Sequence, residues 1–326
     1  MKVPAQYFPS ASWTATYANF IPAIRPNEKK THRVRICAGG NLLDYPGDPS
    51  SPAVSLTNAK LHINNTISDA KKGARYLVLD IKKIYLGNHL TYFQYLRVPL
   101  SLISQEVLDE YELIPDKDGY IYFEVRKGIY GLKEAGLIAF KTLVTNLAPY
   151  GYEPLPFTPG LWSHQSRPTK FTLCVDDSGV KYFHKNDAMH LIKALQHKYE
   201  ITIDWAGKSY CGLDLEWNYD QGYVDVSMKG YVKRALNLFK HVPSSIHTQH
   251  APHTWTKPTF GRTAPQQPTT TSSAPLLDTK GIRRIQAITG TLNFYSEVDP
   301  CIKTALNEIG TSQAKPTETP MHKSKC

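Results

Sequence analysis

Three aspartates in the sequence could act together on a divalent cation. Asp80 ends the apolar stretch YLVLD, and Asp176 and Asp177 are adjacent within FTLCVDDSGVKYF. Neighbouring carboxylates repel each other, so the pair costs stability unless water or a cation screens the charge. Hard divalent cations prefer oxygen ligands of this kind. Two such cations about 4 Å apart can activate an attacking hydroxyl and stabilise a leaving pyrophosphate.

Each acid also has an ordinary structural interpretation. An Asp at the end of a strand commonly caps or turns the chain, and Asp-Asp is a frequent pair in turns. Asp176 lies 96 residues after Asp80, so only the fold can bring the acids together. The secondary structure around them therefore decides between a metal site and two unrelated turns.

The patterns around the acids predict strands alternating with helices. Residues 76–80 are a candidate buried strand, and residues 170–184 form a hairpin with Asp176 and Asp177 at its turn. Two further pairs of strands are expected, at 110–128 around the turn DKDG and at 209–228. Helices are expected at 131–152, 187–200, 230–241 and 281–298. This order predicts an α+β fold in which an antiparallel sheet carries helices on one face.

The composition fits a globular protein with a polyanionic partner. The chain has 326 residues, 41% of them hydrophobic, which is enough for one or two domains, and a formal net charge of +10. That charge suits nucleic acid, although an anionic membrane or simple solubility would also account for it. The five cysteines are scattered without a CxxC pair, so neither a disulfide framework nor a cysteine zinc site is predicted.

The sequence contains no signal for secretion or membrane insertion. Its start, MKVPAQYFPSASW, lacks the long apolar core of a signal peptide, and no apolar run elsewhere could span a bilayer. We therefore predict an intracellular protein, in the cytoplasm or nucleus, that is not secreted and has no membrane partner.

Four segments occur in an order that resembles a known enzyme family. They are YLVLDIKKIYLG, KGIYGLKEAGLIAF, FTLCVDDSGVKYF and YCGLDLEWNY. In this order they resemble the palm motifs of reverse transcriptases of LTR retrotransposons, nearer to copia-like than to gypsy-like elements. The later segment IQAITGTLNFYSEVDPCIKTALNEI resembles the region after the polymerase core of copia-type polyproteins. The resemblance covers residues 30–310, roughly.

The resemblance implies an RNA-directed DNA polymerase, a nucleotidyltransferase that carries out DNA synthesis for a transposable element. Asp80, Asp176 and Asp177 would be its catalytic acids and metal ligands, holding two Mg²⁺ ions, with Mn²⁺ as an alternative. The partners would be an RNA/DNA template-primer and deoxynucleoside triphosphates. The implied architecture is reverse-transcriptase-like fingers and palm, with a partial thumb or connection region.

By the same resemblance, five residues would surround the incoming nucleotide. Arg33 and Arg35 could hold the triphosphate, and Tyr85 would collide with a ribonucleotide 2′-hydroxyl. Gly131 and Glu134 would line the nucleotide at a helix start, where backbone N–H groups favour phosphate. The plain alternatives are a solvated charge run, a core aromatic and an ordinary helix N-terminus.

Four further residues would bind nucleic acid if the resemblance holds. Tyr210 and Trp217 lie in the hairpin that would grip the primer, and Lys233 and Arg234 lie on a thumb-like helix. The alternatives are two core aromatics and a solvated face of an amphipathic helix.

The segment boundaries follow from the resemblance and from composition. The predicted parts are an irregular N-terminal segment (1–28), the fingers and palm (29–228), a thumb-like helix (229–251), a Pro/Thr/Ser-rich linker (252–278) and a connection-like helix with a polar tail (279–326). No segment after residue 310 resembles a ribonuclease H domain.

Two residues depart from the family pattern. Lys83 stands where an acidic or small polar residue is usual, and Glu134 stands where many members have Gln. A carboxylate beside a triphosphate is unfavourable unless a cation such as Lys133 offsets it. These departures favour an alternative, a catalytically degenerate retroelement remnant that only binds nucleic acid.

Overall fold

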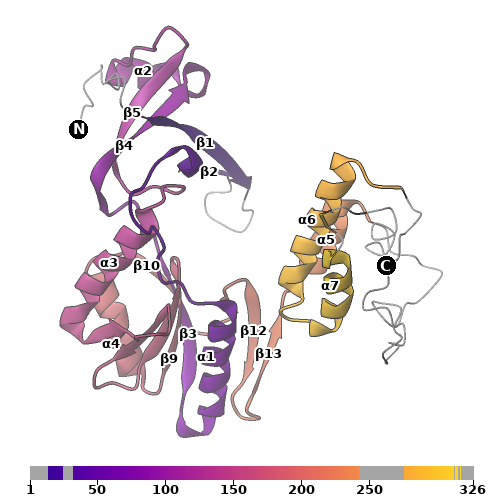
Figure 1. Cartoon of the computed structure of the whole chain (residues 1–326). Coiled ribbons are helices and arrows are strands. Elements are labelled where there is room, and N and C mark those ends of the chain that lie inside the picture. The colour runs from indigo at the N-terminus through magenta and orange to yellow at the C-terminus, as the bar shows by residue number, and fades with distance from the viewer. Residues whose placement is uncertain (1–13, 25–31, 242–274, 312, 315, 317–326) are drawn as a thin grey trace. The chain divides into compact units, whose positions relative to one another are not determined.

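The chain forms two compact units of mixed α and β structure (Figure 1). A computed structural model describes residues 14–24, 32–241, 275–311, 313–314 and 316. The first unit comprises residues 1–211 and 216–224, and the second comprises residues 212–215 and 225–326. No described helix is long and apolar enough to cross a bilayer.

The first sheet of the first unit has four strands in the order β2-β1-β4-β5. Their bounds are β1 Ala15–Ile24, β2 His32–Ala38, β4 His89–Pro99 and β5 Tyr120–Lys127. β1 runs antiparallel to β2 and parallel to β4, and β4 runs antiparallel to β5. A short helix, α2 (Gln105–Tyr111), lies between β4 and β5 in the chain.

Two sequence predictions about this region were wrong. The N-terminal segment is not irregular throughout, because Ala15–Ile24 form β1 and pair with two strands. The turn at Asp116–Gly119 forms as predicted. The residues predicted as a strand before this turn do not form one, and Glu110 and Tyr111 belong to the end of α2. The partner of β5 is β4, which comes from much earlier in the chain.

The second sheet has six strands in the order β10-β3-β9-β8-β7-β6, and the described pairings between neighbouring strands are antiparallel. Its strands are β3 Arg75–Ile81, β6 Tyr152–Pro154, β7 Leu161–His164, β8 Lys170–Cys174, β9 Asp177–Tyr182 and β10 Ile201–Asp204. β3 and the β8–β9 hairpin thus confirm the strands predicted around the three acids.

Helices cover both faces of this six-stranded sheet. α3 (Ala135–Leu147) and α4 (Lys185–Gln196) contribute to the same core as Leu77 and Val180. α1 (Leu56–Ser68) packs on the opposite face. There the buried Lys181 Nζ lies 2.5 Å from Asp69 Oδ2, just after α1. Since successive strand residues point to opposite faces, Val180 and Lys181 mark the two layers.

The prediction that helices cover only one face of the sheet was wrong, because α1 covers the other face. No helix was predicted before residue 76. In the structure Ser55 caps α1 by accepting a hydrogen bond from Asn58 N at 3.1 Å. The helix then buries Ala59, Ile63 and Ile67.

The second unit is mainly helical. Its helices are α5 Tyr231–Phe239, α6 Thr279–Tyr295 and α7 Lys303–Thr311. α6 packs against both α5 and α7, and Tyr231 Oη donates to the Thr291 carbonyl at 2.9 Å. α5 and α6 confirm the two predicted helices, whereas α7 was not predicted.

A three-stranded sheet, in the order β11-β12-β13, contributes residues to both units. Its strands are β11 Ser209–Tyr210, β12 Leu213–Asn218 and β13 Tyr223–Ser227. The pair of strands predicted at 209–228 is therefore confirmed. Most of the predicted linker at 252–278 and most of the polar tail lie outside the described residues.

Candidate active site

The three aspartates predicted to act together lie at one end of the six-stranded sheet. Asp80 is the penultimate residue of β3 and pairs directly with Asp177, the first residue of β9. Asp176 occupies the β8–β9 turn, and its carbonyl oxygen accepts a hydrogen bond from Ile81 N at 2.8 Å. The sheet thus brings together residues that lie about a hundred positions apart in the sequence.

The carboxylates of these residues affect one another electrostatically. The pKa of Asp177 is raised from 3.8 to about 6, mainly by burial and further by the negative charges of Asp176 and Asp80. Each nearby negative charge disfavours ionisation of the next carboxyl group. A cation placed among these groups would relieve this repulsion.

The side-chain positions fit a divalent cation only in part. Among the described residues, no group of three or more His, Cys, Asp or Glu side chains is arranged as a metal cage. Mg²⁺, however, commonly takes one or two carboxylates and completes its shell with water and substrate phosphates. Asp80 and Asp177 on neighbouring strands, with Asp176 beside them, supply the oxygen donors that such a site needs.

The turn that carries Asp176 has a strained backbone. Val175 is exposed and has φ 62°, a left-handed conformation that is a clear outlier for a β-branched residue. Such a conformation costs on the order of 1–3 kcal/mol and persists only where the surroundings impose it. Here the pairing of Cys174 with Asp177 closes the turn. The strands, and not the preference of Val175, therefore fix the position of Asp176.

Two cysteines that the sequence analysis did not connect lie beside the acids. The Cys211 thiol hydrogen-bonds the Cys174 sulfur and lowers the pKa of Cys174 to about 7, although burial and the nearby Asp177 and Asp176 oppose this. Cys174 is the β8 residue opposite Asp177. Because the two cysteines are 37 residues apart, no spacing motif in the sequence signals the pair.

Tyr85 lies near enough to Asp176 to be affected by its charge. It follows β3 in the chain, and burial together with the charge of Asp176 raises its pKa to about 12. Its ring is 5.2 Å from the ring of Tyr130, edge to face at 86°. Tyr85 is therefore a half-buried aromatic at the border of the acidic site.

Arg35 connects to this aromatic pair through Tyr130. Its guanidinium carbon lies 5.2 Å from the centre of the Tyr130 ring, a cation–π geometry. Ala38 N donates to the Tyr130 carbonyl at 2.7 Å, which fastens the end of β2 to this segment. Gly131 has φ 91°, and a Cβ there would collide with the Ala38 carbonyl. The left-handed backbone and the close approach of Ala38 thus require glycine at position 131. The neighbouring Tyr130 contacts both Arg35 and Tyr85.

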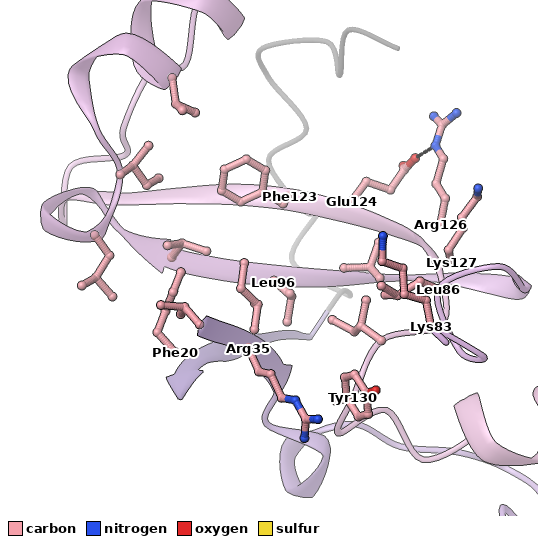
Figure 2. Close-up of a pocket in the computed structure, with 18 of the residues that line it drawn as sticks. Phe20, Arg35, Lys83, Leu86, Leu96, Phe123, Glu124, Arg126, Lys127 and Tyr130 are labelled. Atoms are coloured by element: carbon pink, nitrogen blue, oxygen red, sulfur yellow. Dashed lines mark hydrogen bonds and ion pairs between the residues drawn. The ribbon is translucent and has the colours of Figure 1, made fainter. Parts of the chain in front are cut away.

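A large cavity lies against the four-stranded sheet (Figure 2). Its volume is about 1320 Å³, and its apolar lining includes Phe20, Leu96 and Phe123. Its basic lining residues are Arg33, Arg35, Lys83, Arg126 and Lys127. Figure 2 shows Arg35 beside Tyr130 at one edge, and Glu124 paired with Arg126, whose Nε lies 2.5 Å from Glu124 Oε1. The excess of positive charge suits phosphate groups.

Glu134 does not line this cavity. Its side chain is 6% exposed, and its Oε1 accepts a hydrogen bond from Gln94 Nε2 of β4 at 3.2 Å. A buried carboxylate needs such a donor, and Gln94 supplies one. The carboxylate is therefore committed to the four-stranded sheet, contrary to its predicted contact with the nucleotide.

The residues predicted to bind nucleic acid have different surroundings. Tyr210 is 1% exposed and donates to the Thr172 carbonyl at 3.0 Å, so it belongs to the core and offers no surface to nucleic acid. Trp217 is half-buried, and its Nε1 donates to the Gly207 carbonyl at 2.9 Å. Lys233 and Arg234 are exposed on α5 in the second unit.

Comparison with known proteins identifies no family for the chain. No protein-family model matches the sequence. The structure of telomerase from Candida albicans in complex with a TWJ fragment of telomeric RNA is similar over 70% of this chain and 49% of that chain. The TM-score is 0.35 and the sequence identity is 10%. This chain thus matches about half of the telomerase chain, and its function has to be argued from its own site.

Proposed function

We propose that this chain is an RNA-directed DNA polymerase of the retrotransposon type. The observation that carries the proposal is the pairing of Asp80 with Asp177 across β3 and β9, with Asp176 in the adjoining turn. In this proposal the six-stranded sheet corresponds to a polymerase palm, the four-stranded sheet to fingers, and α5 to part of a thumb. The order of the four sequence motifs supports a copia-like origin.

The acids would hold two Mg²⁺ ions, with Mn²⁺ as an alternative. When bound, these ions lower the pKa of the primer 3′-hydroxyl and neutralise charge on the leaving pyrophosphate. Asp80 and Asp176 are the main ligands in this scheme, and Asp177 is the third acid. Because its pKa is about 6, Asp177 is mostly ionised at pH 7.5 and available to a cation.

The residues around the acids would select and orient the nucleotide. Arg35, held over Tyr130, presents its guanidinium to a triphosphate, and Lys83 lines the same cavity and adds positive charge. Tyr85 would occupy the space beside the sugar and exclude a 2′-hydroxyl. The edge-to-face contact of Tyr85 with Tyr130 supports this role, because the neighbouring ring limits where the Tyr85 ring can lie.

A second candidate function is a retroelement remnant that binds nucleic acid without catalysis. One observation favours it: no group of three or more His, Cys, Asp or Glu side chains among the described residues is arranged as a metal cage. Such a site would leave the basic surface intact while weakening chemistry at the acids.

Primer extension separates the two candidates. The assay uses a labelled DNA primer on an RNA template, with Mg²⁺ or with a chelator, and compares wild type with Asp176→Asn. Asp118→Asn is the matched control, because Asp118 is exposed on a distant turn and the change removes the same charge. Mg²⁺-dependent extension that is lost only in Asp176→Asn supports the polymerase. A folded wild type that binds the template-primer without extending it supports the remnant.

A further inference from the structure

The end of the six-stranded sheet opposite the three acids has a different chemical character. β3 begins there with Arg75 and β8 begins there with Lys170, while β9 ends there at Tyr182 and β10 is followed there by Trp205. These positions converge because neighbouring strands are antiparallel. Arg75 and Asp80 are five residues apart on β3, or roughly 17 Å along the strand. The two ends of the sheet are therefore distinct surfaces.

Aromatic rings and cations at this second end contact one another. The Tyr182 and Trp205 rings lie 6.1 Å apart at 84°, and Lys185 Nζ lies 5.1 Å from the centre of the Trp205 ring. The Arg75 guanidinium carbon lies 4.5 Å from the centre of the Tyr219 ring. These five residues, Arg75, Tyr182, Lys185, Trp205 and Tyr219, are called the basic aromatic cluster below.

The cluster offers rings that are both held in place and accessible. Trp205 is 36% exposed, which is high for a large aromatic side chain. Tyr219 stacks on Trp217 at 5.3 Å and 8°, and its Oη accepts a hydrogen bond from Tyr76 N at 3.1 Å. Rings fixed in this way lose little conformational freedom when a flat ligand stacks on them.

Three acids at this end of the sheet, Asp69, Asp187 and Asp204, have partners. Asp69 pairs with Lys181 and Lys72, and Asp187 pairs with Arg167 at 2.7 Å. Asp204 accepts hydrogen bonds from two backbone N–H groups, those of Ala206 and Lys208. The side chains of Lys170, Lys185 and Lys208 are exposed. A ligand that approaches this end therefore meets positive charge and aromatic surface together.

We propose that the basic aromatic cluster binds single-stranded nucleic acid, at a surface separate from the three acids. Unpaired bases stack on exposed aromatic rings, and phosphates are held by neighbouring Lys and Arg side chains. A duplex hides the faces of its bases, and an acidic peptide would use the cations without the rings. Single-stranded nucleic acid uses both. The proposal does not depend on polymerase activity, because none of its residues belongs to the acidic site.

Photo-crosslinking on the full chain tests the proposal directly. A single-stranded oligonucleotide carrying 5-iodouracil is irradiated with the protein, and crosslinked peptides are identified by mass spectrometry. We expect crosslinks in the peptides that contain Tyr182 and Trp205. Trp205→Leu and Lys185→Glu should each reduce their yield at least about fivefold, since stacking on one ring is worth about 1–3 kcal/mol. Trp205→Phe keeps a ring and should restore most of the yield.

The matched control is Lys193→Glu. Lys193 is exposed on the same helix as Lys185 but near its other end, and the change in net charge is identical. An unchanged yield in Lys193→Glu shows that the loss in Lys185→Glu is local. Circular dichroism confirms that each variant is folded.

Three results would overturn the proposal. The first is crosslinking in folded wild type that maps only to other peptides. The second is a yield in Trp205→Leu equal to that in wild type. The third is equal competition by blunt duplex or by polyglutamate, which would assign the surface to duplex or to an acidic protein. Primer extension is measured on the same variants, and wild-type extension without cluster crosslinks would refute this surface while leaving the proposed polymerase intact.

Discussion

Replacing Asp177 with Asn is expected to stabilise the folded chain when no divalent cation is present. Ionised Asp177 is half-buried beside Asp80 and Asp176, and this environment raises its pKa from 3.8 to about 6. At about 1.4 kcal/mol per pH unit, ionising it costs at most about 3 kcal/mol more in the folded chain than in the unfolded chain, because solvent screens part of the charge of a half-buried carboxylate. Asn has nearly the same shape and carries no charge, so Asp177→Asn should recover up to about 3 kcal/mol at pH 7.5.

The pH dependence of this gain follows from the direction of the shift. Between pH 4 and 6, roughly, the folded wild type binds more protons at Asp177 than the unfolded chain does, so its stability falls as the pH rises. The advantage of Asp177→Asn should therefore be absent below about pH 4, grow through this window and be complete above about pH 7.

Urea unfolding followed by tryptophan fluorescence in EDTA measures this gain at several pH values. Asp118→Asn serves as the control, because it removes one exposed carboxylate far from the site. Addition of Mg²⁺ should reduce the difference in unfolding free energy between Asp177→Asn and wild type, since a cation bound to the folded wild type relieves the same repulsion. The reasoning would be refuted if Asp177→Asn were no more stable than wild type at pH 7.5, or if its gain were the same at pH 3.5.

Three further predictions follow from the structure. Gly131→Ala should lower stability by at least about 1 kcal/mol in thermal melts, since Gly131 has φ 91° and its Cβ would meet the Ala38 carbonyl. Tyr85→Val should increase ribonucleotide incorporation relative to wild type in single-nucleotide extension, whereas Tyr85→Phe should not; equal discrimination in all three would argue against a steric role. The pKa of His62 is lowered to about 4 by burial and by the charge of Lys181. Wild type should therefore lose stability relative to His62→Phe as the pH falls from 6.5 towards 4. A difference in urea midpoints that stays constant over this range would contradict the prediction.

The acids and their strands could be predicted because the signals are local. The apolar run before Asp80 and the two strands around Asp176 and Asp177 each bury a face that is visible in the residue pattern. The sequence also supplied the hairpin at 209–228 and the helices α3 to α6. Its prediction that the acids meet then required only that β3 and β9 be neighbours, and they are.

The errors arise where distant residues decide the outcome. Nothing near Glu134 indicates that Gln94, 40 residues earlier, supplies its hydrogen bond. Aromatic residues such as Tyr210 often bind nucleic acid. Here, however, the Tyr210 hydroxyl donates a hydrogen bond to the carbonyl of Thr172 on β8, and the side chain is buried. The basic aromatic cluster was missed for the same reason, because its residues come from strand ends and loops that only the antiparallel order of the sheet brings together.

The register of β3 also limits which changes in chain length the site tolerates. Asp80 pairs with Asp177, while its neighbours Leu79 and Ile81 belong to the core packed against α3 and α4. Since strand side chains alternate between faces, loss of a single codon within β3 would turn Asp80 towards that core. Such a copy would keep every acidic residue and every recognisable motif, and it would still have lost its site. Counting the acids in a related sequence therefore does not establish function, whereas the spacing between the start of β3 and Asp80 is the feature to compare.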